Sequence, residues 1–281
     1  MEILTTVSAT RRFIAAHKQQ GKTVGLVPTM GYLHQGHLSL VEGARKDNDV
    51  VVVSIFVNPT QFGPQEDLDR YPRDMEKDRN SCHQAGVDAI FMPSAAEMYQ
   101  PGFDTWVQVG SVTETLCGAS RPGHFRGVAT VVTKLFNIVQ PHRAYFGLKD
   151  FQQAVVIKKM VQDLNMPVEI VALPTVREED GLAVSSRNEY LTPKERAQAR
   201  VLYRALRAGK ELILAGECQA QAIRKAMEDE INSVPAAKID YVSVCDPTTL
   251  AEVDAIAPAT LLALAVKIGD TRLIDNMLVE I

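Results

Sequence analysis

Residues 50–57 read VVVVSIFV, an apolar run without alternation of polar and apolar side chains. A strand of this kind is buried on both faces, as are the strands of a parallel sheet covered by helices. Short β-branched runs alternate with helical patterns through the first two thirds of the chain. This order is typical of an α/β fold, in which helices connect the parallel strands of one sheet.

The separate segments follow the same pattern. Ser8 is the expected cap of the first helix. The predicted strands are 23–27, 50–57, 89–92, 144–146 and 168–173, and the predicted helices are 9–20, 37–46, 73–84, 128–139 and 151–164. Strands and helices in this order predict a doubly wound parallel sheet.

The pattern changes beyond Val176. Thr192, followed by Pro193 and Glu195, begins a long predicted helix rich in Ala, Leu and Arg. Pro193 is compatible with this helix because proline is tolerated at the first helical position. A second helix is predicted at 219–232, and strands are predicted at 239–244, 261–268 and 272–277. We therefore expect two domains, an α/β domain of residues 1–175 and a smaller α+β domain of residues 176–281.

Charge and composition exclude some classes of function. Lys and Arg number 30 against 34 Asp and Glu, and the net charge of -4 argues against a broad basic face for nucleic acid. The longest apolar runs are shorter than the ~20 residues that span a bilayer, and the first residues do not resemble a secretory signal. The four cysteines form no C-x-x-C pair, which favours reduced thiols. We expect a cytoplasmic protein with neither a nucleic-acid nor a membrane partner.

The segment 28–37, PTMGYLHQGH, follows a predicted strand and runs into a helix. Ligands of open α/β sheets bind at the carboxyl ends of the strands, and the free N–H groups of a helix start favour phosphate. Gly31 and Gly36 let the backbone approach a ligand closely. His34 and His37 are three residues apart, so both can face one ligand and donate hydrogen bonds to phosphoryl oxygens.

Two other interpretations of the histidine pair stay open. A metal site is one, although an H-E-x-x-H motif and an obvious third ligand are missing, and simple polarity at a helix start is the other. The chain also has neither G-x-G-x-x-G after a strand nor G-x-x-x-x-G-K-[ST]. A dinucleotide dehydrogenase and a P-loop kinase are therefore disfavoured.

The segment HQGH at 34–37 resembles the HIGH signature of the nucleotidylyltransferase superfamily, which class I aminoacyl-tRNA synthetases share. More specific segments are NPTQF at 58–62, RPGHFRGV at 121–128, FGLKDFQQ at 146–153, GLAVSSRN at 181–188 and TRLIDN at 271–276. Together they closely resemble the pantoate–β-alanine ligase (pantothenate synthetase) family over essentially the whole chain. The resemblance implies a Rossmann-like sheet and an ATP-dependent condensation of pantoate with β-alanine to pantothenate. The implied route passes through a pantoyl-adenylate and releases AMP and diphosphate.

The resemblance also implies roles for single residues. His37 is the expected catalytic histidine with His34 as its partner on the phosphates, and Lys149, Ser185, Ser186 and Arg187 complete the catalytic set. The residues expected to bind ATP are Met30, Gly31, Tyr32, Leu33, His34, Gln35, Gly36, His37, Gly147, Leu148, Lys149, Asp150, Val176, Val184, Ser185, Ser186 and Arg187. Those expected to bind pantoate are Gln61 and Gln153, with Asn58, Met30 and Phe62.

The chemistry of these side chains agrees with the implied reaction. Attack of a carboxylate oxygen on the α-phosphorus leaves charge on phosphoryl oxygens, which Lys149, Arg187 and the two histidines can neutralise. Mg²⁺ would share this task, with Asp150 as the expected carboxylate ligand. Without the resemblance, Lys149 and Asp150 fit a solvated helix start equally well. Met30 and Phe62 likewise fit the hydrophobic core as well as a substrate pocket.

Some positions carry less information. Arg121 and His124 lie in a segment rich in Gly and Pro, which fits a flexible flap over the site or a solvated loop. Two residues differ from the family pattern: Leu148, where FGEKD is common, and Val184, where methionine usually precedes SSR. Both leave the charged and hydroxyl positions intact, so they affect the adenine pocket and not the reaction.

Three other functions fit the sequence less well. A different nucleotidylyltransferase would keep the nucleotide on its product, and NPTQF and FGLKDFQQ argue against it. A tRNA-charging enzyme would need room for a basic domain that reads the anticodon. A catalytically silent nucleotide-binding module would show degraded histidines or a lost SSR, whereas both are whole here. The family resemblance also implies a homodimer.

Overall fold

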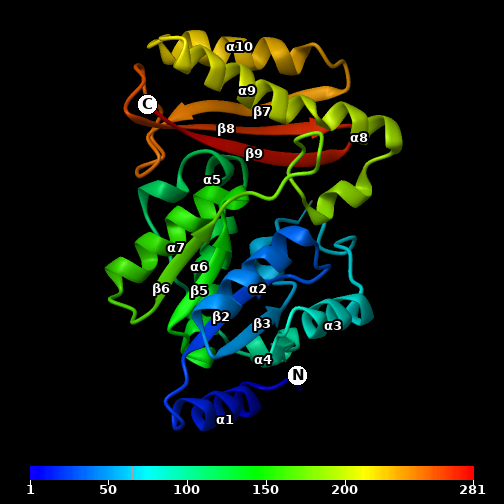
Figure 1. Ribbon diagram of the computed structural model, residues 1–281, viewed down its shortest axis with the longest axis vertical. Coiled ribbons are helices and arrows are strands. Elements are labelled where there is room, and N and C mark those ends of the chain that lie inside the picture. The colour runs from blue at the N-terminus through cyan, green and yellow to red at the C-terminus, as the bar shows by residue number, and fades with distance from the viewer. Residues whose placement is uncertain (65) are drawn as a thin grey trace. The chain divides into compact units, whose positions relative to one another are not determined.

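The fold is taken from a computed structural model, which describes residues 1–64 and 66–281. The chain forms two compact units (Figure 1). The first comprises Met1–Val109, Arg121–Leu148 and Val156–Pro174, and the second comprises Gly110–Ser120, Lys149–Val155 and Thr175–Ile281. Two short segments from the first two thirds of the chain therefore belong to the same unit as its C-terminal part.

A parallel sheet forms the centre of the first unit (Figure 1). Its strands in spatial order are β1 (Glu2–Leu4), β4 (Ala89–Phe91), β3 (Val50–Ile55), β2 (Val24–Thr29), β5 (Arg143–Gly147) and β6 (Glu169–Leu173). Every residue of β3 is buried, as its apolar run predicts. Because β3 and β4 lie on one side of β2 and β5 and β6 on the other, the predicted doubly wound sheet is confirmed. β1 was not predicted, since a three-residue edge strand has too short a pattern to recognise.

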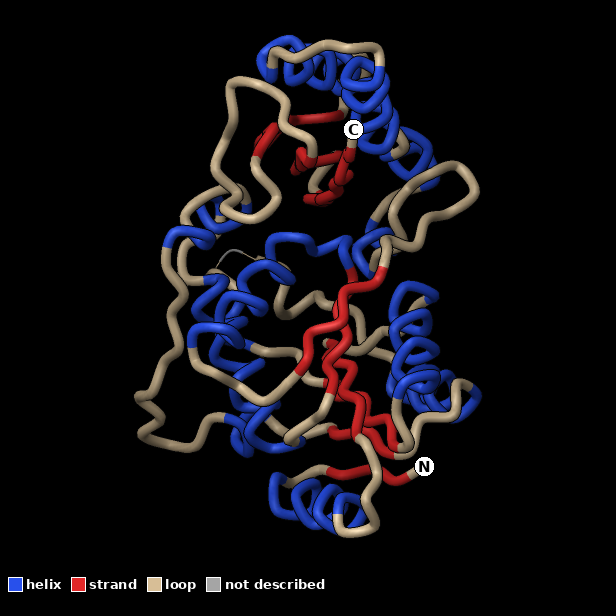
Figure 2. The backbone as a smooth tube through the Cα atoms, turned by 60° about the vertical axis from the view of Figure 1, so that its left-hand side comes forward, coloured by secondary structure: helices blue, strands red, loops and turns tan. Residues whose placement is uncertain are grey.

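Helices cover both faces of this sheet (Figure 2). They are α1 (Val7–Lys18), α2 (Gln35–Asp47), α3 (Met75–Gln84), α4 (Ala95–Met98), α6 (His124–Val139) and α7 (Phe151–Asp163), whose first residues belong to the second unit. Leu40 and Val41 of α2 and Cys82 of α3 share one buried cluster with Val51 and Val53 of β3. Through this cluster, α2 and α3 pack against one face of the sheet.

The starts of several helices differ from the prediction, among them those of α1, α2 and α6. Thr6 caps α1 in place of Ser8, because its side chain accepts a hydrogen bond from the N–H of Ala9 at 3.2 Å. α2 begins at Gln35 and α6 at His124, both earlier than predicted. Gly123 precedes α6 with a φ of 82°, which glycine adopts without strain, so the chain can turn directly into the helix.

The second unit contains an antiparallel sheet of β7 (Ala237–Cys245), β8 (Ala259–Ile268) and β9 (Thr271–Glu280). Helices α9 (Val201–Leu214) and α10 (Ala220–Asn232) share its buried core, and the short α5 (Cys117–Ser120) belongs to the same unit. The predicted α+β character is confirmed. A helix, α8 (Pro193–Ala199), begins after Thr192 as predicted, and Thr192 and Glu195 form a capping box at its start.

The prediction of a single long helix after Thr192 is wrong. α8 and α9 are separate helices that meet at Arg200. The backbone N–H of Arg200 bonds to the carbonyl of Gln198, and its Nε donates to the carbonyl of Ala197 at 2.9 Å. These local bonds replace the regular helical pattern, so the helix is interrupted without a glycine or proline.

Within the described residues, no helix is long and apolar enough to cross a membrane. All four cysteines are free, as predicted. Cys82, Cys117 and Cys245 are buried, whereas Cys218 is exposed.

Candidate active site

The strand order predicts a ligand site at the carboxyl ends of β2 and β5. These strands are neighbours in the sheet, and the chain winds outward from them in opposite directions. Ligands of doubly wound sheets bind at this reversal point. The predicted ATP segment 30–37 directly follows β2, Gly147 ends β5, and Leu148 begins the next turn, η3 (Leu148–Asp150). The topology thus brings together the starts of two segments that are far apart in the sequence.

The backbone just after β2 takes an unusual path. Gly31 and Tyr32 both have left-handed φ angles, 83° and 52°. A Cβ at position 31 would lie 3.0 Å from Asp78 Oδ2 and 3.0 Å from Ile55 Cγ2, so only glycine fits without a shift. The Asp78 carboxylate accepts hydrogen bonds from the N–H groups of Tyr32 at 2.8 Å and Leu33 at 2.6 Å. The loop is therefore held by a buried side chain that the sequence motifs do not include.

His34 and His37 lie together at the start of α2. His34 is the N-cap residue, and its carbonyl accepts from the N–H of His37 at 2.8 Å. The two imidazole rings are stacked, with centroids 4.0 Å apart and planes at 23°. Both side chains are half-buried. Two ring donors thus lie beside the N–H groups of a helix start, where negative charge is favoured.

The predicted pantoate residues after β3 form a connected group. Gln61, at the end of η1 (Pro59–Gln61), places its Nε2 3.2 Å from the sulfur of Met30. Asn58 Nδ2 donates to Gln61 Oε1 at 3.0 Å, and the hydroxyl of Tyr99 donates to Asn58 Oδ1 at 2.8 Å. Asn58 is 1% exposed, so a buried amide orients the side chain of Gln61. Phe62 follows and is half-buried, with its ring edge-on to Tyr71.

Arg121 and His124 fasten the backbone of this group. The carbonyl oxygen of Gln61 accepts from His124 Nδ1 at 2.8 Å and from Arg121 Nη2 at 3.3 Å. Because Nδ1 donates to the carbonyl, His124 Nε2 can accept from Arg121 Nη1 at 3.1 Å, which assigns the neutral tautomer. The structure therefore ties both side chains to η1, rather than leaving them in a solvated loop.

Glu66 completes this network through Arg121. Nε of Arg121 donates to Glu66 Oε1 at 2.8 Å, and the pair is largely shielded from solvent, with side-chain exposures of 15% for Arg121 and 25% for Glu66. Burial acts to raise the pKa of Glu66, but the hydrogen bonds and positive charge of Arg121 outweigh it and hold the pKa below its usual value. Glu66 is thus a charged partner at ordinary pH.

Lys149, Asp150 and Gln153 belong to the second unit. The ammonium of Lys149 lies 3.5 Å from Asp150 Oδ1, and the carbonyl of Lys149 accepts from Asn276 Nδ2 of β9 at 2.9 Å. Gln153 is half-buried, whereas its neighbour Gln152 is buried. The start of α7 is therefore anchored to the antiparallel sheet by Asn276.

Gln152 has a structural task that the sequence did not reveal. Its Oε1 accepts from the N–H of Cys117 at 3.0 Å, and its Nε2 donates to the carbonyls of Thr115 at 2.8 Å and Val112 at 3.1 Å. One buried amide thus holds the segment 110–120 to α7.

The predicted loop of Val176, Val184 and the SSR segment also lies in the second unit. The N–H of Val184 donates to the carbonyl of Val176 at 3.0 Å, which closes a short hairpin. Ser185 caps the turn η4 (Ser186–Tyr190), and its Oγ accepts from the N–H of Arg187 at 3.3 Å. The cap fixes the backbone that carries the Arg187 guanidinium.

Asp150 is the residue that we expect to bind Mg²⁺. Within the described part of the chain, no three His, Cys, Asp or Glu side chains are grouped so that they could hold a metal ion. Mg²⁺ is commonly held by one or two carboxylates together with substrate phosphates, and a partly exposed Asp150 suits that arrangement. Among residues 1–64 and 66–281, no further His, Cys, Asp or Glu is grouped with the histidine pair to complete a metal site.

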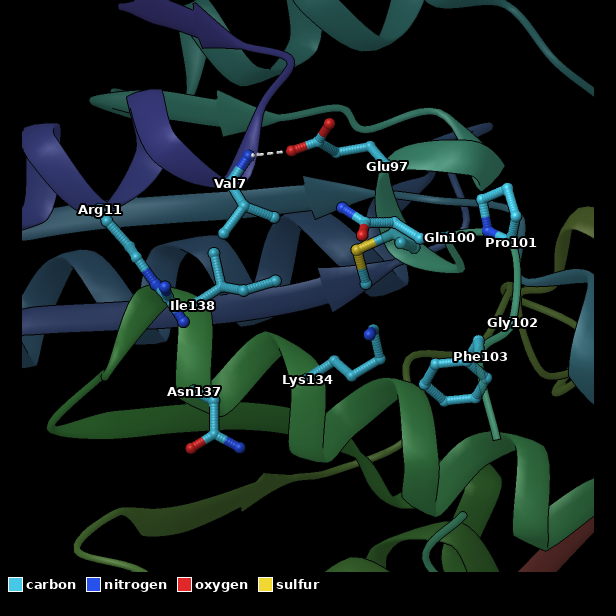
Figure 3. Close-up of a pocket in the computed structure, with 11 residues that line it drawn as sticks. Val7, Arg11, Glu97, Gln100, Pro101, Gly102, Phe103, Lys134, Asn137 and Ile138 are labelled. Carbon is cyan, nitrogen blue, oxygen red and sulfur yellow. Dashed lines mark hydrogen bonds between the residues drawn. The ribbon is translucent and has the colours of Figure 1, made fainter. Parts of the chain in front are cut away.

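A separate pocket of about 550 Å³ lies between the start of α1, the segment after α4 and the second half of α6 (Figure 3). Arg11, Lys134 and Phe103 are among its lining residues, and Glu97 beside them accepts from the N–H of Val7 at 2.7 Å. None of the residues that the sequence singled out lines this pocket. The predicted site residues therefore lie outside this pocket.

A ligand site at the reversal point of a doubly wound sheet, with histidines at a helix start, is the arrangement of nucleotide-binding α/β proteins. The family model described as pantoate-beta-alanine ligase matches residues 2–278, and the chain belongs to this family. It is 62% identical to the pantothenate synthetase of Moorella thermoacetica, covering 100% of this chain and 99% of that protein. These matches identify the protein as a ligase.

Solved structures agree with the family assignment. The pantothenate synthetase of Thermus thermophilus superposes with a TM-score of 0.94 at 51% identity, covering 99% of each chain. The pantoate-beta-alanine ligase of Francisella tularensis, solved in complex with Beta-gamma ATP and Beta-alanine, superposes with a TM-score of 0.83 at 35% identity, covering 99% of this chain and 97% of that one. The similarity to both therefore extends over the whole fold.

Proposed function

We propose that the protein joins pantoate to β-alanine in an ATP-dependent reaction that forms pantothenate. The observation that carries this proposal is the stacked pair of His34 and His37 at the start of α2, in a chain whose family match runs from residue 2 to 278. Gln61 contacts Met30, which belongs to the same segment after β2 as the two histidines. The relative from Francisella tularensis, crystallised with an ATP compound and β-alanine, supports ATP and β-alanine as substrates here.

The first half-reaction is adenylation of pantoate. A carboxylate oxygen of pantoate attacks the α-phosphorus of ATP, the bond to the bridging oxygen breaks, and diphosphate leaves with the electron pair. His37 and His34 donate hydrogen bonds to phosphoryl oxygens, and the charges of Lys149 and Arg187 stabilise the leaving group. Asp150 would hold Mg²⁺, which would supply further neutralisation of phosphate charge.

The second half-reaction is transfer to the amine. The free amine of β-alanine attacks the acyl carbon of pantoyl-adenylate, AMP leaves with the electron pair, and the new amide nitrogen loses its extra proton. Gln61, oriented by Asn58, holds pantoate and then meets β-alanine, while Met30 and Phe62 pack against the methyl groups of pantoate. Gln153 is the second pantoate anchor.

The remaining predicted residues bind ATP. The backbone of Gly31, Tyr32, Leu33, Gln35 and Gly36 lines the triphosphate, Gly147, Leu148, Val176 and Val184 lie toward the nucleotide, and Ser185 and Ser186 donate to phosphate. We assign residues 1–175 to ATP and pantoate binding and residues 176–281 to a lid. A homodimer, which the family resemblance implies, and a cytoplasmic location complete the proposal.

The direct test is AMP release from purified protein mixed with ATP, Mg²⁺, pantoate and β-alanine. The proposal requires both the acid and the amine, so omission of either abolishes sustained AMP release. AMP release that ignores the omission contradicts the proposal. A nucleotidylyltransferase of the same superfamily would instead leave the nucleotide on its product, which mass spectrometry of the products distinguishes.

The role of Arg187 is tested by isotope exchange between diphosphate and ATP in the presence of pantoate. We expect Arg187→Ala to slow this exchange strongly, because adenylation loses a positive charge on the leaving group. Arg207→Ala is the matched control, since Arg207 is an exposed residue of α9 paired with Glu211. Normal exchange in Arg187→Ala would remove Arg187 from the adenylation step.

A further inference from the structure

Asp78 is a buried carboxylate outside every motif of the chain. It lies in the first part of α3 and is 2% exposed. Burial of an isolated carboxylate is unfavourable, so such a group needs hydrogen bonds that compensate for the lost water. Asp78 receives them from two consecutive backbone N–H groups, those of Tyr32 and Leu33, each on a different carboxylate oxygen.

The loop that Asp78 contacts has an unusual backbone conformation. Gly31 and Tyr32 are both left-handed, and for the non-glycine residue Tyr32 this conformation is unfavourable. The neighbouring N–H of Gly31 donates to Thr29 Oγ1 at 3.2 Å, and Thr29 in turn donates to the carbonyl of Ser54 at 2.8 Å. Three successive N–H groups are thus satisfied by side chains, and Asp78 supplies two of these bonds.

The path of this loop decides where the two histidines stand. His34 follows Leu33 directly and is the N-cap of α2, in an extended conformation with φ −138° and ψ 176°. Its ring stacks on the ring of His37 one turn later. A shift of the backbone at 32–33 therefore moves the His34 ring and disrupts the stacked pair.

Since the motifs lie in a different part of the sequence, only the fold links Asp78 to the histidines. We propose that Asp78 is a positioning residue, whose carboxylate holds the backbone of Tyr32 and Leu33 so that His34 and His37 present their rings to the phosphates. The proposal rests on the proposed function for the identity of the ligand. Burial raises the pKa of Asp78, while the hydrogen bonds from Leu33 and Tyr32 oppose that shift.

The geometry predicts the effect of a conservative change. Asp78→Asn keeps the size of the side chain but replaces one acceptor oxygen by a donor, so one of the two N–H groups loses its partner. We expect turnover to fall between roughly tenfold and a hundredfold, because small displacements of catalytic groups cost that much. KM for ATP should rise more than KM for pantoate, since Asp78 holds the N–H groups of Tyr32 and Leu33, which belong to the segment proposed to bind ATP.

A matched control separates positioning from stability. Cys82→Ala removes a buried side chain one turn further along the same helix. This change weakens the packing of α3 without touching the N–H groups of the loop. We expect Cys82→Ala to lower the melting temperature but to leave the ratio of the two KM values unchanged.

The decisive measurement does not depend on turnover. In NMR spectra of the full chain, the ring signals of His34 and His37 should shift in Asp78→Asn and stay in place in Cys82→Ala. Through-hydrogen-bond couplings from the amides of Tyr32 and Leu33 to Cγ of Asp78 should be visible in the unaltered protein, which decides the matter even if Asp78→Asn does not fold. Absent couplings, or unshifted histidine rings in a folded Asp78→Asn, overturn the proposal. If the unaltered protein fails to release AMP, the proposed function is wrong, while these spectra still decide the role of Asp78.

Discussion

The imidazole rings of His34 and His37 stack with 4.0 Å between their centroids. His34 caps α2 and His37 lies in its first turn, so both rings share the positive end of one helix. An anion bound there meets backbone N–H groups and ring donors at the same time. The sequence spacing of the two histidines therefore agrees with the phosphate-binding role that we propose for them.

Replacing His37 with Ala should lower turnover by about 10²–10³-fold, as the loss of one preorganised transition-state donor does. The comparison variant is His83→Ala, because His83 is an exposed histidine of α3. Steady-state kinetics with both substrates measure the effect, and circular dichroism checks the fold. A folded His37→Ala protein with near-normal turnover would show that His37 is not the catalytic donor.

Gly127 of α6 should not tolerate a side chain. A Cβ at this position would lie 2.4 Å from the backbone oxygen of Thr60 and 2.8 Å from Cα of Gln61, so η1 would have to move. We expect Gly127→Ala to destabilise the protein by about 1–3 kcal/mol, as overpacking does, and to raise KM for pantoate. Urea unfolding and kinetics provide the two measurements.

Gly63→Ala is the control for that substitution, because a Cβ there meets only ordinary contacts at 3.7 Å with Glu66. We expect Gly63→Ala to change the stability and the KM for pantoate much less than Gly127→Ala does. If the two substitutions have equal effects, the close approach of α6 to η1 is not the reason why position 127 requires glycine.

The ion pair of Glu66 and Arg121 should give a pH-dependent stability. The pKa of Glu66 is lower in the folded protein than usual, so the pair stabilises the fold fully above the usual glutamate pKa of about 4.3. That contribution disappears as the pH falls through the lower folded pKa. Melting temperatures of the unaltered protein and of Glu66→Gln should therefore differ at pH 7 and converge in acid. A difference that stays constant down to pH 2 would contradict this.

Cys218 should be the cysteine that reacts first with a maleimide at pH 7. It is exposed, whereas burial raises the pKa of Cys82 to about 12 and of Cys245 to about 11. Cys117 is also buried, at 6% exposure. Mass spectrometry should find one adduct on the native protein and four after denaturation. Early labelling of Cys82 in a folded sample would show that α3 opens more readily than its packing indicates.

The central strands and the histidine pair were predictable from sequence for a simple reason. A strand covered on both faces must be apolar at successive positions, which β3 is, and a ligand loop after such a strand shows itself by glycines and polar side chains. The interruption at Arg200 was not predictable, because both α8 and α9 have good helical sequences and the break arises from hydrogen bonds of one arginine.

The sequence by itself determined the alternation of strands and helices, the family and the side chains that meet the substrates in our proposal. The tertiary structure alone decided what holds those side chains. Asp78 reaches Leu33 across 45 residues, and His124 reaches the carbonyl of Gln61 across 63. Such partners leave no periodic signal in the sequence, because the spacing between them is set by the packing of whole helices and not by the geometry of one element.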